Sequence, residues 1–170
     1  VTGRSAARFV AAQGYTPVII DTRSLQDLPA DVAAYDHIVD VQAWPDEDVV
    51  FAVLSPGLSM QSCLVRSARS KGVELCSDID LFVQASRAPI LAITGTNGKS
   101  TVTSLVGHLL ATDGHSVGVG GNLGEPALDL LAFEREYYVL ELSSFQLERS
   151  QIHPFSRAAI LNITEDHVDQ

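Results

Sequence analysis

Cysteine, aromatic side chains and cations are all scarce in this sequence of 170 residues. Its two cysteines, Cys63 and Cys76, match no metal-ligand spacing and make no disulfide framework, which indicates a reduced protein. The 11 lysines and arginines face 21 acidic residues, and this net charge of −10 argues against binding to a nucleic-acid backbone. No apolar run approaches the roughly 20 residues of a membrane span. We therefore expect a soluble, cytoplasmic protein that binds neither nucleic acid nor a membrane.

Short apolar runs alternate with amphipathic stretches, which is typical of βαβ units around a largely parallel sheet. Helices are predicted at about 2–13, 60–70, 77–85, 99–112 and 126–132. Strands are predicted at 16–21, 37–40, 49–54, 73–76, 89–94, 116–120, 137–142 and 157–162. Because the series restarts around a second glycine-containing loop, the sequence predicts two α/β domains, at 1–77 and 78–170.

A loop that reads TGTNGKST, residues 94–101, follows a predicted strand and opens a predicted helix. It lacks the first glycine of the usual phosphate-binding pattern, because Ile93 occupies that position. A phosphate site needs a strand, exposed backbone N–H groups, a lysine and a helix N-terminus. Gly95 and Gly98 free the backbone, and Lys99 supplies the charge. The alternative is a tight turn with a solvated lysine, which explains Gly95 but not the lysine at the helix start.

Several oxygen-bearing side chains accompany this loop. Ser100 or Thr101 would offer a hydroxyl to Mg²⁺, as the last residue of such loops does. Glu141 ends a predicted buried strand, where ligands gather in a doubly wound sheet, although a solvated carboxylate is the alternative. Asp21 follows an early glycine by about 20 positions, which is the ribose position of a dinucleotide fold. An ordinary residue at a strand end is the alternative for Asp21.

The loop TGTNGKST resembles the ATP loop of the Mur ligase family, the ATP-dependent amide ligases that build the peptide of bacterial cell-wall precursors. Folylpolyglutamate synthases and cyanophycin synthetases share this loop style. Two further stretches, YVLELSSFQLE (138–148) and AAILNITEDHVD (158–169), resemble the members of the family that add D-glutamate to UDP-N-acetylmuramoyl-L-alanine. The related ligase that adds the third residue has His-Gly where this chain has Phe145 and Gln146.

The resemblance implies a Rossmann-like N-terminal domain that binds the UDP-substrate, followed by the start of a P-loop-type parallel-sheet ATPase domain. It implies that the first strand of the sheet, which would lie mid-sheet, precedes Val1. A carbamylated lysine and a C-terminal domain that holds D-glutamate would lie beyond Gln170. The implied enzyme is a monomer that uses ATP to form an acyl phosphate, which the amine of D-glutamate attacks. The 170 residues alone are not expected to turn over.

The resemblance also assigns residues to sites. The ATP site would comprise Gly95, Thr96, Asn97, Gly98, Lys99, Ser100 and Thr101. Catalysis would rest on Lys99, Glu141 and His167. Mg²⁺, or Mn²⁺ in its place, would be bound by Ser100, Thr101, Glu141 and His167. The UDP-substrate would contact Thr2, Gly3, Asp21, Thr22, Arg23, Gly57, Asn122, Ser143 and His167.

Two of these residues also have explanations that involve no binding site. Three other functions remain open as well. Asn122 also suits a turn, and a lone surface histidine such as His167 is a weak ligand for Mg²⁺, which prefers oxygen. The other functions are a different ligase of the superfamily, a P-loop kinase or simple nucleotide-binding module, and a nicotinamide-binding domain at 1–77. The stretch LELSSFQLE argues against the first. Uridine-nucleotide binding that depends on Asp21 would argue against the second, and the ATP loop argues against the third.

Overall fold

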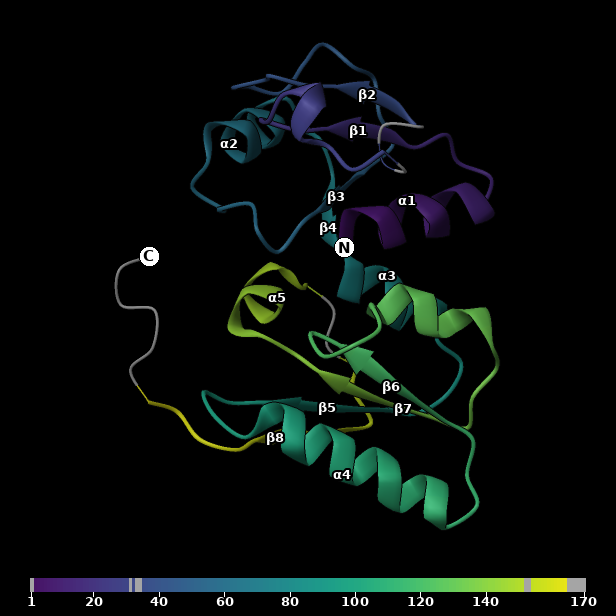
Figure 1. Cartoon of the computed structure of the whole chain (residues 1–170). Coiled ribbons are helices and arrows are strands. Elements are labelled where there is room, and N and C mark those ends of the chain that lie inside the picture. The colour runs from purple at the N-terminus through teal and green to yellow at the C-terminus, as the bar shows by residue number, and fades with distance from the viewer. Residues whose placement is uncertain (1, 31, 33–34, 152–153, 165–170) are drawn as a thin grey trace. The chain divides into compact units, whose positions relative to one another are not determined.

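The chain divides into two units, Val1–Asp78 and Ile79–Gln170 (Figure 1). This division lies one residue after the predicted boundary between 77 and 78. The computed structural model describes residues 2–30, 32, 35–151 and 154–164. Both units are built from parallel strands and helices, so the α/β class predicted from the sequence is confirmed. None of the helices in these ranges is both long and apolar enough to cross a membrane.

The second unit is built on a four-stranded parallel sheet with the strand order β6-β7-β5-β8. Its strands are β5 (Ile90–Thr94), β6 (Val117–Gly121), β7 (Tyr137–Glu141) and β8 (Arg157–Ile160). The register pairs Ile93 with Glu141 and Thr94 with Ile160, and it pairs Gly121 with Glu141 as well. Because all four strands run the same way, their carboxyl ends lie along one edge of the sheet, where ligands bind in such folds.

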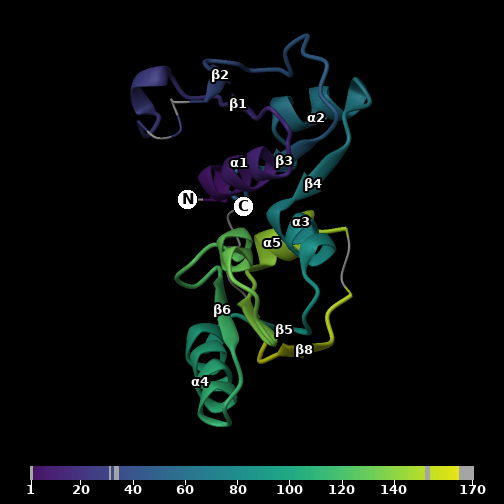
Figure 2. The same ribbon diagram turned by 90° about the vertical axis from the view of Figure 1, so that its right-hand side faces the viewer.

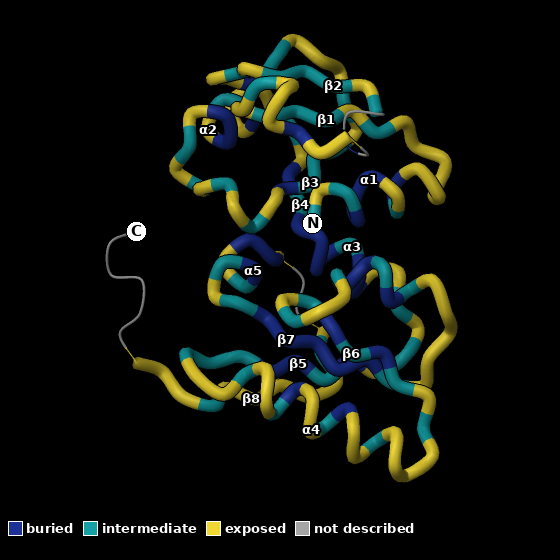
Figure 3. The backbone as a smooth tube through the Cα atoms, viewed as in Figure 1, coloured by how far each residue is buried: buried dark blue, intermediate teal, exposed yellow. Residues whose placement is uncertain are grey.

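Helices cover both faces of this sheet (Figures 1 and 2). They are α3 (Asp78–Ala85), α4 (Lys99–Thr112), the 3₁₀ helix η2 (Ala127–Ala132) and α5 (Ser144–Arg149). Helix α4 packs so closely on β6 that a Cβ atom on Gly107 would collide with Cγ2 of Val119. On the opposite face, Phe82 of α3 packs edge to face against Tyr138 of β7, with ring centroids 5.0 Å apart. Strand β7 is almost wholly buried as a result, whereas β8 is exposed (Figure 3).

The first unit contains two separate pairs of parallel strands, β1 with β2 and β3 with β4. Its elements are α1 (Thr2–Ala12), β1 (Val18–Ile20), the 3₁₀ helix η1 (Leu25–Asp27), β2 (Asp36–Ile38), β3 (Ala52–Leu54), α2 (Cys63–Ser70) and β4 (Leu75–Ser77).

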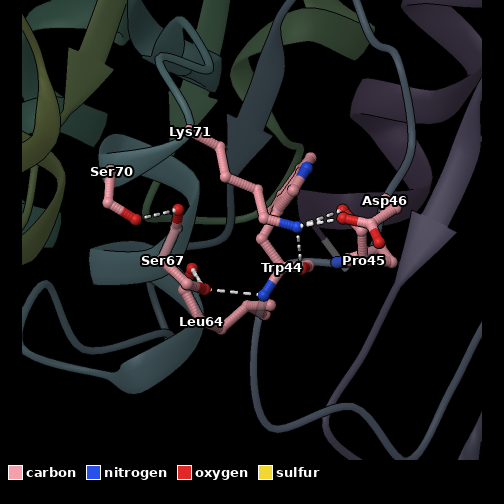
Figure 4. Close-up of polar contacts among 7 residues, drawn as sticks. All are labelled: Trp44, Pro45, Asp46, Leu64, Ser67, Ser70 and Lys71. Atoms are coloured by element: carbon pink, nitrogen blue, oxygen red, sulfur yellow. Dashed lines mark hydrogen bonds and ion pairs between the residues drawn. The ribbon is translucent and has the colours of Figure 1, made fainter.

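A lysine ties a loop to the core of the first unit (Figure 4). That core consists of Trp44, Leu54, Leu64, Val65, Ala68 and Leu75. Lys71 Nζ donates hydrogen bonds to the carbonyls of Trp44 (3.1 Å) and Pro45 (3.3 Å) and forms an ion pair of 2.6 Å with Asp46. A cavity of about 390 Å³ opens between this loop and residues 71–73, and it contains none of the predicted site residues.

Several elements differ from the sequence predictions. Strand β3 covers only the last three residues of the predicted 49–54, because pairing with β4 begins at Ala52. Helix α2 begins at Cys63 rather than near residue 60, since the hydroxyl of Ser62 accepts a hydrogen bond from Val65 N and caps the helix there. The segment predicted as a helix at 126–132 is a 3₁₀ helix, and α5 was not predicted.

Two helical glycines predict stability changes of opposite sign. Gly107→Ala should lower the free energy of unfolding by about 1–3 kcal/mol, because the added methyl group collides with Val119. Gly3→Ala should raise it by up to about 1 kcal/mol, because no described residue outside the local helix lies within 4 Å of the added methyl and alanine favours helix. Urea unfolding followed by circular dichroism measures both. A Gly107→Ala variant as stable as the parent would contradict the packing of α4 on β6.

Candidate functional site

The loop after β5 depends on two glycines with unusual backbone angles. Gly95 has φ +143°, and a Cβ atom there would lie 3.1 Å from both the backbone nitrogen and oxygen of Asn162. Gly98 has φ +83° and is the N-cap of α4. Residues other than glycine rarely adopt these angles. The loop therefore needs glycine for its conformation at Gly98, and for both conformation and space at Gly95.

The segment that follows β8 holds the loop through five hydrogen bonds. Thr96 N donates to the carbonyl of Asn162 (3.1 Å), and Asn97 N donates to Asn162 Oδ1 (2.9 Å). Asn162 Nδ2 donates back to the carbonyl of Asn97 (2.9 Å). Thr96 Oγ1 donates to the carbonyl of Thr164 (3.2 Å) and accepts from Thr164 N (3.1 Å). Two segments that are far apart in sequence are thereby joined beside the carboxyl end of β5.

Sequence reasoning gave Asn162 no role. Its only signal was an asparagine at the last position of the predicted strand 157–162, and an asparagine that enters a turn gives the same signal.

The ammonium group of Lys99 is bent back over the loop. Its Nζ donates to the carbonyls of Gly95 (2.8 Å) and Thr96 (3.1 Å). In the first turn of α4, the backbone N–H groups of Lys99, Ser100 and Thr101 have no acceptor within the helix. The positive end of the helix dipole adds to their attraction for an anion. The structure thus brings together the lysine, the free N–H groups and the helix start that the sequence predicted.

Glu141 is a buried carboxylate at the end of β7, with 2% of its surface exposed. Its Oε1 accepts a hydrogen bond of 2.7 Å from Asn122 Nδ2, and its carbonyl accepts one of 2.9 Å from Asn122 N. Within the described ranges, Oε2 has no hydrogen-bond partner. An incompletely paired carboxylate is costly to bury, so a cation is the natural partner for this oxygen.

The predicted metal and substrate residues of the second unit are only partly brought together. Asn122 lies on Glu141, as described. Ser143 is the N-cap of α5, where its hydroxyl accepts a bond of 3.2 Å from Gln146 N in a capping box. His167 lies outside the described residues. Among the residues that are described, no three His, Cys, Asp or Glu side chains form a metal-binding group.

The predicted substrate residues of the first unit lie on separate elements. Asp21 follows β1, and its carboxylate accepts bonds from Arg23 Nε (3.0 Å), Nη2 (2.7 Å) and backbone N (2.8 Å). These bonds from Arg23 hold the pKa of Asp21 below its ordinary value. Thr22 is exposed beside them. Thr2 and Gly3 begin α1, and Gly57 lies in the turn after β3. The carboxylate of Asp21 is thus engaged by Arg23 rather than by those residues.

Two family models match the chain. The Mur ligase middle domain matches residues 93–170, from the start of the loop onward. The Mur ligase MurD-like N-terminal domain matches residues 1–77. The chain belongs to the Mur ligase family. The N-terminal-domain match lies within the first unit, and the middle-domain match lies within the second.

Three curated relatives of this Mur ligase chain share the name UDP-N-acetylmuramoylalanine--D-glutamate ligase. The protein of Yersinia pseudotuberculosis serotype I (strain IP32953) is 47% identical over 176 residues, and that of Salmonella paratyphi A (strain ATCC 9150 / SARB42) is 47% identical over 174. That of Photorhabdus laumondii subsp. laumondii is 44% identical over 174. The alignments cover 100% of this chain and 39% of each relative.

A solved structure, that of a pseudomurein peptide ligase type C from Methanothermus fervidus, aligns with a TM-score of 0.42 at 20% identity. This alignment covers 96% of the present chain and 36% of the solved one. Likeness of this kind assigns no single residue of the Mur ligase chain. The site roles given above therefore stay predictions.

The Asp21–Arg23 pair predicts a pH-dependent contribution to stability. Because the folded-state pKa of Asp21 is lowered, the pair stabilises the fold above the ordinary aspartate pKa, and this is lost as pH falls through the lowered value. Arg23→Ala should raise the pKa of Asp21 and lower the free energy of unfolding at neutral pH by at most about 1 kcal/mol, since Arg23 is largely exposed. Carboxyl NMR titration and urea unfolding measure the two effects.

An exposed arginine of α2, Arg66, provides the control. Its Nη2 donates a hydrogen bond to Cys63 Sγ. Arg66 is not one of the groups that shift the pKa of Asp21. Arg66→Ala should leave the pKa of Asp21 unchanged. An Asp21 pKa that did not move in Arg23→Ala would contradict the pairing.

Proposed function

We propose that this chain is the UDP-substrate-binding and ATP-binding part of a cytoplasmic, monomeric ligase in peptidoglycan precursor synthesis. The enzyme would join D-glutamate to UDP-N-acetylmuramoyl-L-alanine. Whole-chain similarity to D-glutamate ligases supports the proposal. The observation that carries it is the loop at 95–101, with Lys99 bent over it, at the same sheet edge as Glu141, whose Oε2 has no hydrogen-bond partner among the described residues.

The proposed reaction proceeds through an acyl phosphate. The γ-phosphoryl group of ATP passes to the carboxylate of UDP-N-acetylmuramoyl-L-alanine, which is the nucleophile, and ADP leaves. The amine of D-glutamate then attacks the acyl carbon, and phosphate leaves as the amide forms. Because the transferred phosphoryl group carries spread negative charge, the protein has to supply positioned donors rather than a covalent side chain.

Residues of the loop would supply those donors. The N–H groups of Lys99, Ser100 and Thr101 would donate to phosphate oxygens, aided by the positive end of the α4 dipole. The ammonium of Lys99 would exchange the carbonyls of Gly95 and Thr96 for a phosphate oxygen. Lys99 would thus be the side chain that stabilises the negative charge of the transferred phosphoryl group.

Oxygen ligands fit Mg²⁺, and Mn²⁺ in its place, at this edge. The fit rests on Glu141, which keeps a buried oxygen without a hydrogen-bond partner in the part of the chain that the structure describes. Glu141 Oε2 and the hydroxyl of Ser100 or Thr101 would hold the ion, with His167 as the proposed ligand of a second ion. When bound, the ion would neutralise phosphate charge. Asn122 would keep Oε1 occupied, so that Oε2 is the oxygen left for the ion.

The UDP part of the substrate would bind to the first unit. Asp21, Thr22 and Arg23 would surround the uracil and its ribose, while Thr2, Gly3 and Gly57 would lie by the diphosphate or the uracil. Asn122 and Ser143 would lie near the reacting end of the substrate. For a ribose hydroxyl to bind Asp21, it would have to share or displace the Arg23 bonds.

Binding titrations test the two half-sites separately. We expect Lys99→Ala to weaken Mg·ATP binding by about ten- to hundredfold, since a charged hydrogen bond is lost. Lys71→Ala is the matched control, because Lys71 is the other lysine of the chain and its hydrogen bonds to Trp44 and Asp46 lie within the first unit. Asp21→Asn should weaken UDP-N-acetylmuramoyl-L-alanine binding, whereas Asp36→Asn, at the opposite end of the β1–β2 pair, should not. Isothermal calorimetry measures all four.

The outcomes separate the proposed ligase from its rivals. Loss of each ligand in its own variant supports the ligase. Binding of Mg·ATP without any binding of the UDP-sugar, in a chain whose first unit is folded, would favour a kinase or a simple nucleotide-binding module.

A second prediction concerns the metal. Glu141→Gln should weaken Mn²⁺ binding in the presence of ADP by about tenfold or more, as measured by electron paramagnetic resonance. The same change should leave the metal-free chain as stable as the parent or more stable, because it removes a poorly paired buried charge. Glu148→Gln, on an exposed carboxylate of α5, should leave Mn²⁺ binding unchanged. Full Mn²⁺ affinity in Glu141→Gln would rule out Glu141 as a ligand.

A further inference from the structure

One side chain outside the loop determines which way the loop's peptide groups face. We propose that Asn162 is a positioning residue for phosphate binding, and that its carboxamide turns the N–H of Gly98 towards the bound anion. The proposal rests on the ATP site proposed above and adds a residue to it. No contact between Asn162 and the phosphate is required.

The side chain of Asn162 uses both ends of its amide on a single loop residue. Oδ1 accepts from Asn97 N and Nδ2 donates to the carbonyl of Asn97, each at 2.9 Å. The backbone carbonyl of Asn162 also accepts from Thr96 N at 3.1 Å. Asn162 therefore binds three consecutive peptide groups of the loop.

The position of Asn162 is itself fixed by the sheet. Ile160 pairs with Thr94 at the end of the β5–β8 ladder, and Leu161 N donates to the carbonyl of Thr94 at 2.9 Å. The backbone of Asn162 then passes so close to Gly95 that a Cβ atom on that glycine would lie at 3.1 Å. The side chain thus extends from a rigid support.

The geometry of the trans peptide converts these bonds into an orientation of the loop. In a trans peptide the C=O and the following N–H point in opposite directions. The N–H groups of Thr96 and Asn97 face Asn162, so the carbonyls of Gly95 and Thr96 face away, and both of these carbonyls accept from Lys99 Nζ. The next peptide is reversed, because the carbonyl of Asn97 faces Asn162.

That reversal points the N–H of Gly98 away from Asn162, in the direction of the carbonyls that hold the Lys99 ammonium. The Gly98 N–H can then join those of the first turn of α4 in binding an anion. Without the donor Nδ2, the carbonyl of Asn97 would be free to turn to that side, where it would repel phosphate. Only a side chain that both accepts and donates can hold Asn97 in this way.

The test uses two substitutions that differ in what they remove. Asn162→Ala removes both bonds to Asn97. Asn162→Asp keeps an acceptor for Asn97 N but loses the donor and adds a negative charge. Ser156→Ala is the matched control, because Ser156 Oγ accepts from Ile90 N (3.3 Å) at the other end of the same pair of strands. Affinities for Mg·ATP and for Mg·tripolyphosphate are measured by calorimetry, alongside urea unfolding.

We expect Asn162→Ala to lower the affinity for both ligands by roughly tenfold. Asn162→Asp should lower both affinities further. Ser156→Ala should leave both affinities unchanged even where it lowers stability. The amide resonance of Gly98 should shift on addition of tripolyphosphate in the parent chain and in Ser156→Ala, and much less in Asn162→Asp.

Wild-type affinity in Asn162→Ala and Asn162→Asp, with ATP still bound by the parent, would overturn the positioning role and leave the proposed ATP site standing. A loss in Ser156→Ala equal to that in Asn162→Ala would show that only general stability matters, and would overturn the positioning role too. A folded parent chain that bound neither ligand would overturn the ATP site and the role of Asn162 together.

Discussion

The approach of Gly95 to the backbone of Asn162 is the contact on which the second unit's site depends. It brings the loop after β5 against the segment after β8 at a separation where a Cβ atom on Gly95 would lie only 3.1 Å from the backbone of Asn162. Hydrogen bonds between residues 65 positions apart then become possible, and they fix the direction of successive peptide groups. The conformation of the loop in turn positions Lys99 and the N–H groups at the start of α4.

The site also keeps a feature that works against stability. Glu141 is buried at the end of β7 with one oxygen bonded to Asn122 and the other without a hydrogen-bond partner among the described residues. A protein selected for stability alone would place an apolar or amide side chain there. Local arrangements of this kind, held by a well-packed surrounding sheet, are where a binding function is expected to lie.

The strongest elements of the second unit were predictable because local signals agreed with the fold. Strand β5 is a continuous apolar run buried in a parallel sheet, and Gly98 followed by Lys99 marks the start of α4. The short strand β3 was predicted too long, since its length depends on where β4 pairs with it. The capping box of Ser143 and Gln146, which starts α5, was legible in the sequence and was overlooked.

The residues of the candidate site were easier to predict than the contacts between them. The residues of the loop at 95–101 lie together on the chain, so their pattern carried the prediction. The bonds of Asn162 to Asn97, of Asn122 to Glu141 and of Arg23 to Asp21 are of another kind. The first two depend on strand register, which composition does not encode. The third depends on a side-chain conformation that competes with the role expected for Asp21.

The bent conformation of Lys99 has a consequence for the thermodynamics of the loop. A long, flexible side chain loses rotamer freedom when it is fixed, and here two loop carbonyls already fix it without any anion. That entropy is lost when the chain folds rather than when a ligand arrives. An incoming phosphate therefore receives a cation that exchanges two neutral acceptors for a charged one, and little further rotamer entropy of Lys99 is lost on binding.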